Sequence, residues 1–169
     1  MVLTKTPICN FGEKTKSFEL KGIDGQLHKL EDHIGKNGLL IMFICNHCPY
    51  VKAIIRDIVE DCKNLKKEGV NSIAIMSNDT KEYPEDSFEN MKIFSKKFNF
   101  SFPYLIDETQ EIAKEYGAVC TPDFFGYNSK LELQYRGRIR ELKDLKPINS
   151  GESDLSRAMR LIIKTGKGP

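Results

Sequence analysis

The pattern of apolar and polar positions divides this chain into short strands and amphipathic helices. Residues 39–44 are continuously apolar and too few for a helix, which predicts a buried strand. From residue 48 to residue 67 the apolar positions recur at helical spacing, and Pro49 is tolerated in the first turn, where its missing N–H is not needed. Residues 70–76 alternate as a second strand after Gly69, a plausible helix stop.

The rest of the chain continues this alternation of strands and helices. Two strands, at residues 18–20 and 26–30, flank Asp24-Gly25 and predict a hairpin. Further strands are expected at 102–106, 124–127 and 131–136, and the last two form another hairpin. Helices are expected at 85–98, at 107–116 with Asp107 as its cap, and from Ser153 to about 164. This order predicts one α/β domain over residues 1–169, with a central mixed sheet flanked by helices.

Composition fits such a domain and argues against several classes of partner. The 169 residues suffice for a hydrophobic core without disulfides. A net charge of +2, from 26 basic and 24 acidic residues, is too balanced to favour nucleic acid or a membrane surface. The longest apolar run is far shorter than a membrane span, and the first twelve residues lack the features of a signal peptide. We therefore expect a cytoplasmic protein.

The cysteines direct attention to one short motif. They number five, an odd and scattered set that does not resemble the disulfide framework of a secreted domain: Cys9, Cys45, Cys48, Cys62 and Cys120. Cys45-Asn46-His47-Cys48 joins the apolar strand to the longest helix. The N–H groups and dipole of a helix N-terminus stabilise a thiolate, the reactive form of cysteine. We expect Cys45 to be the attacking thiol and Cys48 the resolving thiol of a dithiol–disulfide couple.

Two further interpretations of this motif are weighed. A protonated His47 would add positive charge beside Cys45 and make the disulfide a stronger oxidant, whereas a solvent-exposed His47 would have no such effect. A Cys-x-x-Cys pair is also half of a zinc site, but no second pair is present, and the adjacent His47 and Cys48 would strain a tetrahedron. We expect neither a metal nor another cofactor.

Several segments resemble the thioredoxin-like superfamily, and within it the peroxiredoxin-like (AhpC/TSA) branch. They are the hairpin at residues 18–30, the strand leading into the Cys45–Cys48 motif, and residues 117–123 with Thr121-Pro122. The resemblance implies a thioredoxin-like fold with an N-terminal β-hairpin extension. It also implies a cis peptide bond before Pro122 and docking of substrate against Thr121 and Pro122.

The chain departs from both branches of this superfamily. Ile44 stands where thioredoxins have tryptophan, and the strand near Leu39 lacks their buried acid. Ile41 and Cys45 replace the proline and threonine of the peroxidatic motif. We therefore expect a thiol–disulfide oxidoreductase that exchanges with protein or small-molecule disulfides and with an unidentified electron donor or acceptor. The alternatives are a thiol peroxidase and, third, a metal-binding or redox-sensing module.

Outside the motif, few residues suggest chemistry. Cys120, just before Thr121, either forms an alternative disulfide with the motif or stays a packed thiol. Cys62 lies on the apolar helix face and is expected in the core. We expect Asp79 to be a solvated loop residue rather than a proton carrier. Surface positions are expected for two arginines, Arg136 and Arg138.

Overall fold

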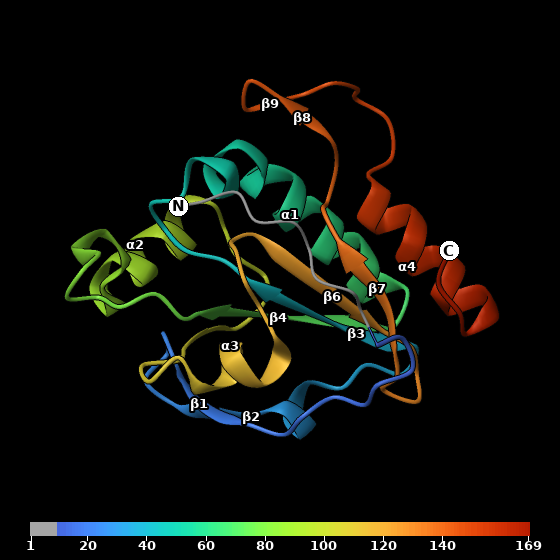
Figure 1. The fold of residues 1–169 in the computed structure, drawn as a ribbon, viewed down its shortest axis with the longest axis horizontal. Coiled ribbons are helices and arrows are strands. Elements are labelled where there is room, and N and C mark those ends of the chain that lie inside the picture. Colours follow the sequence, from blue (N-terminus) through green and yellow to red (C-terminus); the bar gives the residue numbers. More distant parts are fainter. Residues whose placement is uncertain (1–9) are drawn as a thin grey trace.

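A seven-stranded mixed sheet forms the centre of the computed structural model, which describes residues 10–169 (Figure 1). Its order is β2-β1-β5-β4-β3-β6-β7. β3, β4 and β5 are parallel, whereas β1, β6 and β7 each run antiparallel to a neighbour. The strands are β1 (Glu19–Gly22), β2 (Leu27–Lys29), β3 (Gly38–Phe43), β4 (Val70–Met76), β5 (Tyr104–Ile106), β6 (Asp123–Tyr127) and β7 (Leu133–Gly137).

Helices cover both faces of the sheet, so β3 is buried throughout (Figure 1). Leu40 and Met42 belong to the apolar core beneath α1 (Pro49–Lys67), α2 (Phe88–Lys97) and α4 (Asp154–Thr165). Ile41 and Phe43 project to the opposite face, where α3 (Glu111–Tyr116) and the short 3-10 helix η1 (Leu30–His33) lie. Alternate side chains of one strand thus enter two cores, as the pleat requires.

This architecture confirms the predicted α/β fold class with a central mixed sheet and an N-terminal hairpin, β1–β2. The bounds of β4 and the end of α1 agree with the prediction. Ser153 caps α4, as expected, by accepting a hydrogen bond from the N–H of Ser156 at 2.9 Å. Cys62 is on the buried face of α1, as expected, and burial raises its pKa to about 12.

The predicted helix over residues 85–98 is wrong at its start. Pro84–Asp86 forms a separate 3-10 turn, η2, and α2 begins only at Phe88. The reason is the cap, since the side chain of Ser87 accepts a hydrogen bond from the N–H of Asn90 at 3.2 Å. The chain therefore turns before α2, and this turn places Asp86 away from the helix.

The helix expected from Asp107 also begins later, at Glu111. The carboxylate of Asp107 still satisfies the start of α3, because it accepts hydrogen bonds from the N–H groups of Ile112 and Ala113 at 3.3 and 3.0 Å. Gln110, at φ 60°, makes the left-handed turn between them. Asp107 thus caps the helix across a short loop rather than from the adjoining position.

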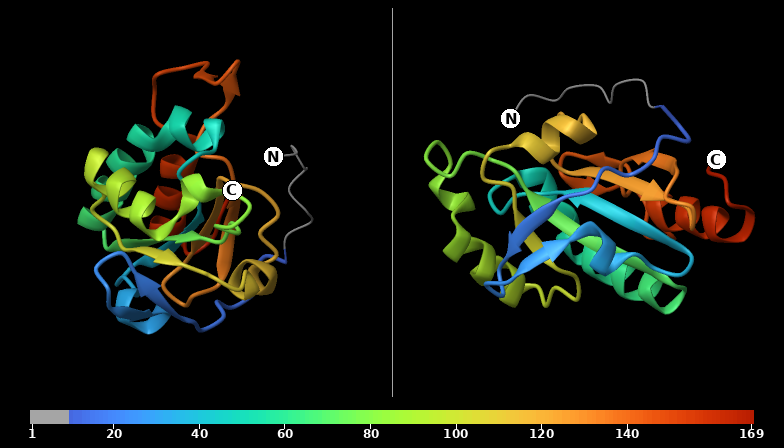
Figure 2. Two further views of the ribbon diagram at one scale, coloured as in Figure 1. Left: turned by 90° about the vertical axis from the view of Figure 1, so that its left-hand side faces the viewer. Right: turned by 90° about the horizontal axis from the view of Figure 1, so that it is seen from below.

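A small hairpin that was not predicted separates the sheet from α4. It consists of β8 (Leu142–Lys143) and β9 (Lys146–Pro147), and it stands away from the body of the molecule (Figures 1 and 2). Each of these strands has only two residues, which is too short to show the alternation of apolar and polar residues that predicts a strand. Within residues 10–169, none of the helices combines the length and apolarity needed to cross a bilayer.

Candidate active site

The predicted dithiol, Cys45 and Cys48, lies where β3 leads into α1. Cys48 is the N-cap residue of α1, and Pro49 occupies the first helical position. Both cysteines are reduced and 0% exposed to solvent. Their sulfur atoms are hydrogen-bonded to each other. The two thiols therefore need little movement to be joined as a disulfide.

The start of α1 favours a thiolate at Cys48. Cys45 donates its S–H to the sulfur of Cys48, which also accepts hydrogen bonds from the backbone N–H groups of Val51 and Tyr50. These contacts lower the pKa of Cys48 to about 6, while the shared hydrogen bond and burial raise that of Cys45. The role of Cys45 as the attacking thiol stays a prediction, while α1 begins only after Cys48, so the N–H groups at its start contact the sulfur of Cys48.

The residues before β6 form one wall of the site. The peptide bond between Thr121 and Pro122 is cis, as predicted. The hydroxyl of Thr121 lies 3.4 Å from the sulfur of Cys45, and its carbonyl oxygen lies 3.4 Å from the sulfur of Cys48. A hydrogen bond from the side chain of Thr121 also lowers the pKa of Cys48. Thr121 thus contacts both sulfurs of the dithiol.

The opposite wall is built around a buried carboxylate that the sequence did not reveal. Asp86 is 0% exposed, yet it has a full set of donors. One carboxylate oxygen accepts the backbone N–H groups of Asn46 and His47, at 2.7 and 3.2 Å. The other lies 2.5 Å from Nδ1 of His47 and accepts the side-chain amide of Asn78 at 2.9 Å. Asp86 therefore fixes the backbone and the imidazole between the two cysteines.

His47 and Asn46 are held by aromatic residues as well. The imidazole stacks on the ring of Tyr83, with centroids 4.9 Å apart and planes 11° from parallel. The hydroxyl of Tyr104 donates a hydrogen bond of 2.8 Å to the side-chain oxygen of Asn46. The side chain of His47 is 26% exposed. His47 is therefore held between Asp86 and Tyr83 with its side chain partly exposed, and its effect on the dithiol stays a prediction.

Sequence reasoning missed Asp86 because it was assigned to a helix. The signal that would have excluded it is Ser87, an N-cap residue type directly after the acid. The acid considered instead was Asp79, which is exposed and accepts a hydrogen bond from the N–H of Lys81, as a solvated loop residue does. The strand residue Leu39, where thioredoxins bury an acid, is itself buried and apolar. In this chain the buried acid beside the dithiol, Asp86, comes from the segment before α2.

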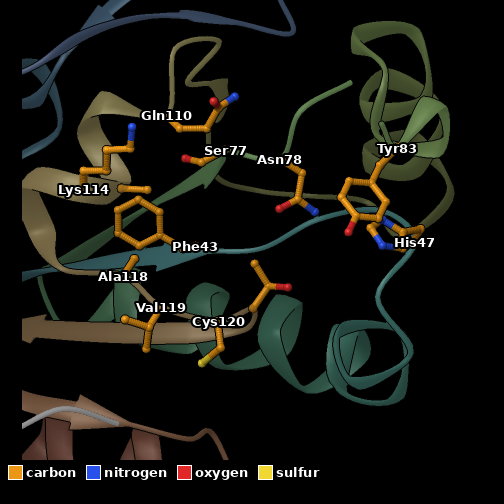
Figure 3. Close-up of a pocket in the computed structure, with 12 residues that line it drawn as sticks. Phe43, His47, Ser77, Asn78, Tyr83, Gln110, Lys114, Ala118, Val119 and Cys120 are labelled. Atoms are coloured by element: carbon orange, nitrogen blue, oxygen red, sulfur yellow. The ribbon is translucent and has the colours of Figure 1, made fainter. Parts of the chain in front are cut away.

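A cavity of about 310 Å³ opens beside the dithiol (Figure 3). His47 and Tyr83 lie at one end of it, and Lys114 projects from α3 at the other. Cys120 also lines the cavity; its sulfur lies 3.9 Å from the carbonyl oxygen of Pro122, and burial raises its pKa. Cys120 is reduced, so both interpretations of this thiol stay open.

The expectation of a surface position is wrong for Arg136 and correct for Arg138. The side chain of Arg136 is only 5% exposed, and its guanidinium contacts the buried carboxylate of Asp123 at 2.8 Å. It also donates to the carbonyl oxygen of Gly117 at 2.7 Å. Arg136 is buried because it neutralises a carboxylate that the start of β6 carries inward. The other arginine, Arg138, is 58% exposed.

Comparison with known sequences identifies relatives that share this architecture. The sequence profile of the AhpC/TSA family matches residues 11–142. Among curated proteins, the thiol-disulfide oxidoreductase ResA of Bacillus thuringiensis is 27% identical over 122 residues, which are 72% of this chain and 66% of that protein. The chain thus matches just under two thirds of the length of this relative.

Solved structures extend the similarity to the fold. An uncharacterized conserved protein from Geobacillus kaustophilus is 37% identical, with a TM-score of 0.82 over 98% of this chain and 90% of that protein. A secreted disulfide oxidoreductase from Mycobacterium tuberculosis is 16% identical, with a TM-score of 0.64 over 85% of this chain and 95% of that protein. At that identity it supports the thioredoxin-like fold alone. Together the comparisons support the general class of oxidoreductase.

Proposed function

Because this chain belongs to the AhpC/TSA family, we propose that it is a thiol–disulfide oxidoreductase that uses Cys45 and Cys48. The observation that carries the proposal is the pair of hydrogen-bonded sulfurs at the N-cap of α1, contacted on the other side by Thr121. A dithiol in this position combines a stabilised thiolate with a nearby second thiol. The second thiol can attack the mixed disulfide and release the substrate.

In the proposed reaction, the thiolate of Cys48 attacks one sulfur of a substrate disulfide. A mixed disulfide forms, and the other substrate sulfur leaves as a thiolate that takes up a proton. Cys45 then loses its proton and attacks the sulfur of Cys48, which releases the second substrate thiol. The substrate gains two electrons and two protons, and the protein ends with a Cys45–Cys48 disulfide. The same steps in reverse oxidise a substrate dithiol.

The proton of Cys45 needs an acceptor inside the site. The sulfur of Cys45, a ring nitrogen of His47 and a carboxylate oxygen of Asp86 lie within 4.8 Å of one another. We assign the acceptor role to the His47–Asp86 pair, since its 2.5 Å contact holds the imidazole beside the dithiol. A buried thiol with a raised pKa becomes a nucleophile only when such a base removes its proton.

The substrate is proposed to dock against Thr121 and Pro122. Both sulfurs are covered in the reduced protein, and Thr121 contacts each of them. A disulfide therefore reaches the dithiol only if the segment of Thr121 or the side chain of His47 yields. The partners in this scheme are a protein or small-molecule disulfide and the electron donor or acceptor that restores the dithiol.

Insulin reduction by dithiothreitol tests the activity, with Cys45→Ser and Cys48→Ser as variants. We expect both variants to lose turnover, because each lacks one sulfur of the couple. Cys62→Ala, which alters a core thiol outside the site, is the matched control. If Cys45→Ser and Cys48→Ser each turn over like the unaltered protein, the dithiol is not the active group and the proposal fails.

Trapping of mixed disulfides with Ellman's reagent tests the order of attack. We expect Cys45→Ser to trap the reagent faster at pH 7 than Cys48→Ser does, because the backbone N–H groups of Val51 and Tyr50 at the start of α1 still contact the remaining thiol of Cys45→Ser. The opposite order would assign the first attack to Cys45. Stopped-flow mixing with hydrogen peroxide separates the alternative function, since a thiol peroxidase would react far faster than free cysteine does.

A further inference from the structure

Beside the dithiol, three side chains of different chemistry converge: Cys45, His47 and Asp86. One ligating atom of each lies within 4.8 Å of the other two. Thiolate, imidazole and carboxylate are the ligand types of Zn²⁺, and catalytic zinc sites use three such protein ligands with a fourth position open. We propose that the reduced protein binds one Zn²⁺ ion through Cys45, His47 and Asp86.

The distances allow this site with a small adjustment. Zinc bonds of about 2.0–2.3 Å at tetrahedral angles separate neighbouring ligand atoms by roughly 3.4 Å. His47 and Asp86 are now 2.5 Å apart, so they must separate by about 1 Å while the sulfur of Cys45 approaches them. The imidazole of His47 is the group that shifts, because its side chain is 26% exposed, whereas Asp86 is fully buried and also accepts hydrogen bonds from Asn46 and Asn78.

The surroundings hold the ligands as the second shell of a metal site does. Backbone N–H groups of Asn46 and His47, and the side-chain amide of Asn78, all donate to Asp86. These donors orient the carboxylate. The carboxylate oxygen that now contacts Nδ1 of His47 can then also bind an ion. His47, Asn78 and Tyr83 also line the 310 Å³ cavity, which gives an ion a path to the site (Figure 3).

Zinc binding and disulfide chemistry exclude each other in this arrangement. The ion binds the Cys45 sulfur as a thiolate and displaces its proton to solvent. When a disulfide substrate is reduced to two thiols, Cys45 and Cys48 give up two electrons and form a disulfide with each other. Cys45 is then no longer a thiolate ligand, and Zn²⁺ is released. Metal affinity is therefore confined to the reduced state. Binding itself requires no disulfide substrate, so it can be measured whether or not the protein proves to be an exchange enzyme.

Co²⁺ and Zn²⁺ titrations of the reduced full chain test the site. We expect one Co²⁺ per chain with the thiolate charge-transfer and visible bands of a tetrahedral ion, and displacement by one Zn²⁺. His47→Gln and Asp86→Asn should each weaken Zn²⁺ at least about 100-fold, and Asn78→Ala about 10–100-fold. Matched controls outside the site, His33→Gln, Asp79→Asn and Cys62→Ala, should bind as the unaltered protein does.

The contrasting possibility is a chelate of the two thiols alone. In that case Cys48→Ser would lose the ion, whereas His47→Gln and Asp86→Asn would keep it, and the proposal would be overturned. The proposed site predicts the reverse ranking, with Cys48→Ser the mildest of the three. Absence of stoichiometric Co²⁺ and Zn²⁺ binding to the reduced protein would equally overturn it. His47→Gln, at a partly exposed position, provides the test if Asp86→Asn fails to fold.

Discussion

Two buried carboxylates flank the dithiol, and they are neutralised in different ways. On the histidine side, Asp86 accepts hydrogen bonds from backbone and side-chain amides and lies against His47. On the proline side, Asp123 pairs with the guanidinium of Arg136. Arginine keeps its charge at all pH values that proteins encounter.

This difference gives the two pairs different roles: one supports the fold, and the other lies beside the reactive sulfur. The Arg136–Asp123 pair ties β7 to β6 and, through Gly117, to the end of α3, so it fixes the segment that contains the cis bond. The His47–Asp86 pair is beside Cys45 and contains a group that can accept a proton. We therefore expect substitutions in the Arg136–Asp123 pair, on the proline side, to lower the stability of the fold. Oxidation or reduction of the dithiol should instead affect the His47–Asp86 pair, on the histidine side.

The largest effect on stability is expected from Arg136→Ala. The substitution leaves Asp123 buried without its cation, which costs about 3–5 kcal/mol when a buried ion pair loses one partner. Guanidinium unfolding of the reduced protein, followed by circular dichroism, measures the change. The same substitution should leave the pKa of Cys48 lowered, because the hydrogen bonds from Cys45, Val51 and Tyr50 that lower it are unchanged.

Arg138→Ala is the control. Arg138 lies two residues after Arg136, and it forms an exposed ion pair with Asp154. Exposed ion pairs contribute roughly 0–1 kcal/mol. If the two substitutions destabilised the protein equally, the Arg136–Asp123 pair would not be the support of the proline side.

The second prediction concerns the pH dependence of the reduced protein. The folded pKa of Cys48 is about 6 and an unfolded cysteine has a pKa of about 8.5, so the folded state binds fewer protons between these values. The free energy of unfolding should therefore rise with pH over this window, and this stabilisation is lost as the pH falls toward 6. Above about pH 8.5 the raised pKa of Cys45 acts oppositely and lowers stability.

The oxidised protein is the natural control, because neither sulfur titrates in a disulfide. Unfolding curves at pH 6, 7 and 8.5 should diverge between the two redox states, while Cys48→Ser should lose the rise. Parallel curves for the reduced and oxidised proteins would show that the start of α1 does not stabilise a thiolate at Cys48.

Most of the fold follows from sequence periodicity, because long buried segments have clear patterns. The strand at residues 39–44 and the helix at 48–67 are apolar at the positions that the sheet and its cover require. The errors fall where a single side chain decides the path of the backbone. Ser87 caps α2 and so sets where this helix begins, and the carboxylate of Asp107 caps α3 from across a loop. Such contacts leave no periodic signal.

The site divides in the same way. The dithiol, the cis bond before Pro122 and the proximity of Thr121 follow from local motifs and from the resemblance to a known fold. Asp86 does not, because it is 40 residues from Asn46 in sequence and is brought there by the turn before α2. The burial of Arg136 likewise depends on which acid faces it. Partners of buried charges become visible only when the chain is folded.

The smallest effect is expected from Cys120→Ser on the proline side. The Cys120 sulfur is half-buried, its pKa is raised by burial, and it makes a long contact of 3.9 Å with the Pro122 carbonyl oxygen. Replacement by serine should change the free energy of unfolding by less than about 1 kcal/mol. Because the sulfurs of Cys45 and Cys48 are already hydrogen-bonded to each other, mass mapping of the oxidised protein should find them joined with or without Cys120. A disulfide containing Cys120 in the oxidised protein would instead move part of the redox chemistry onto the proline side and break the contrast between the two walls.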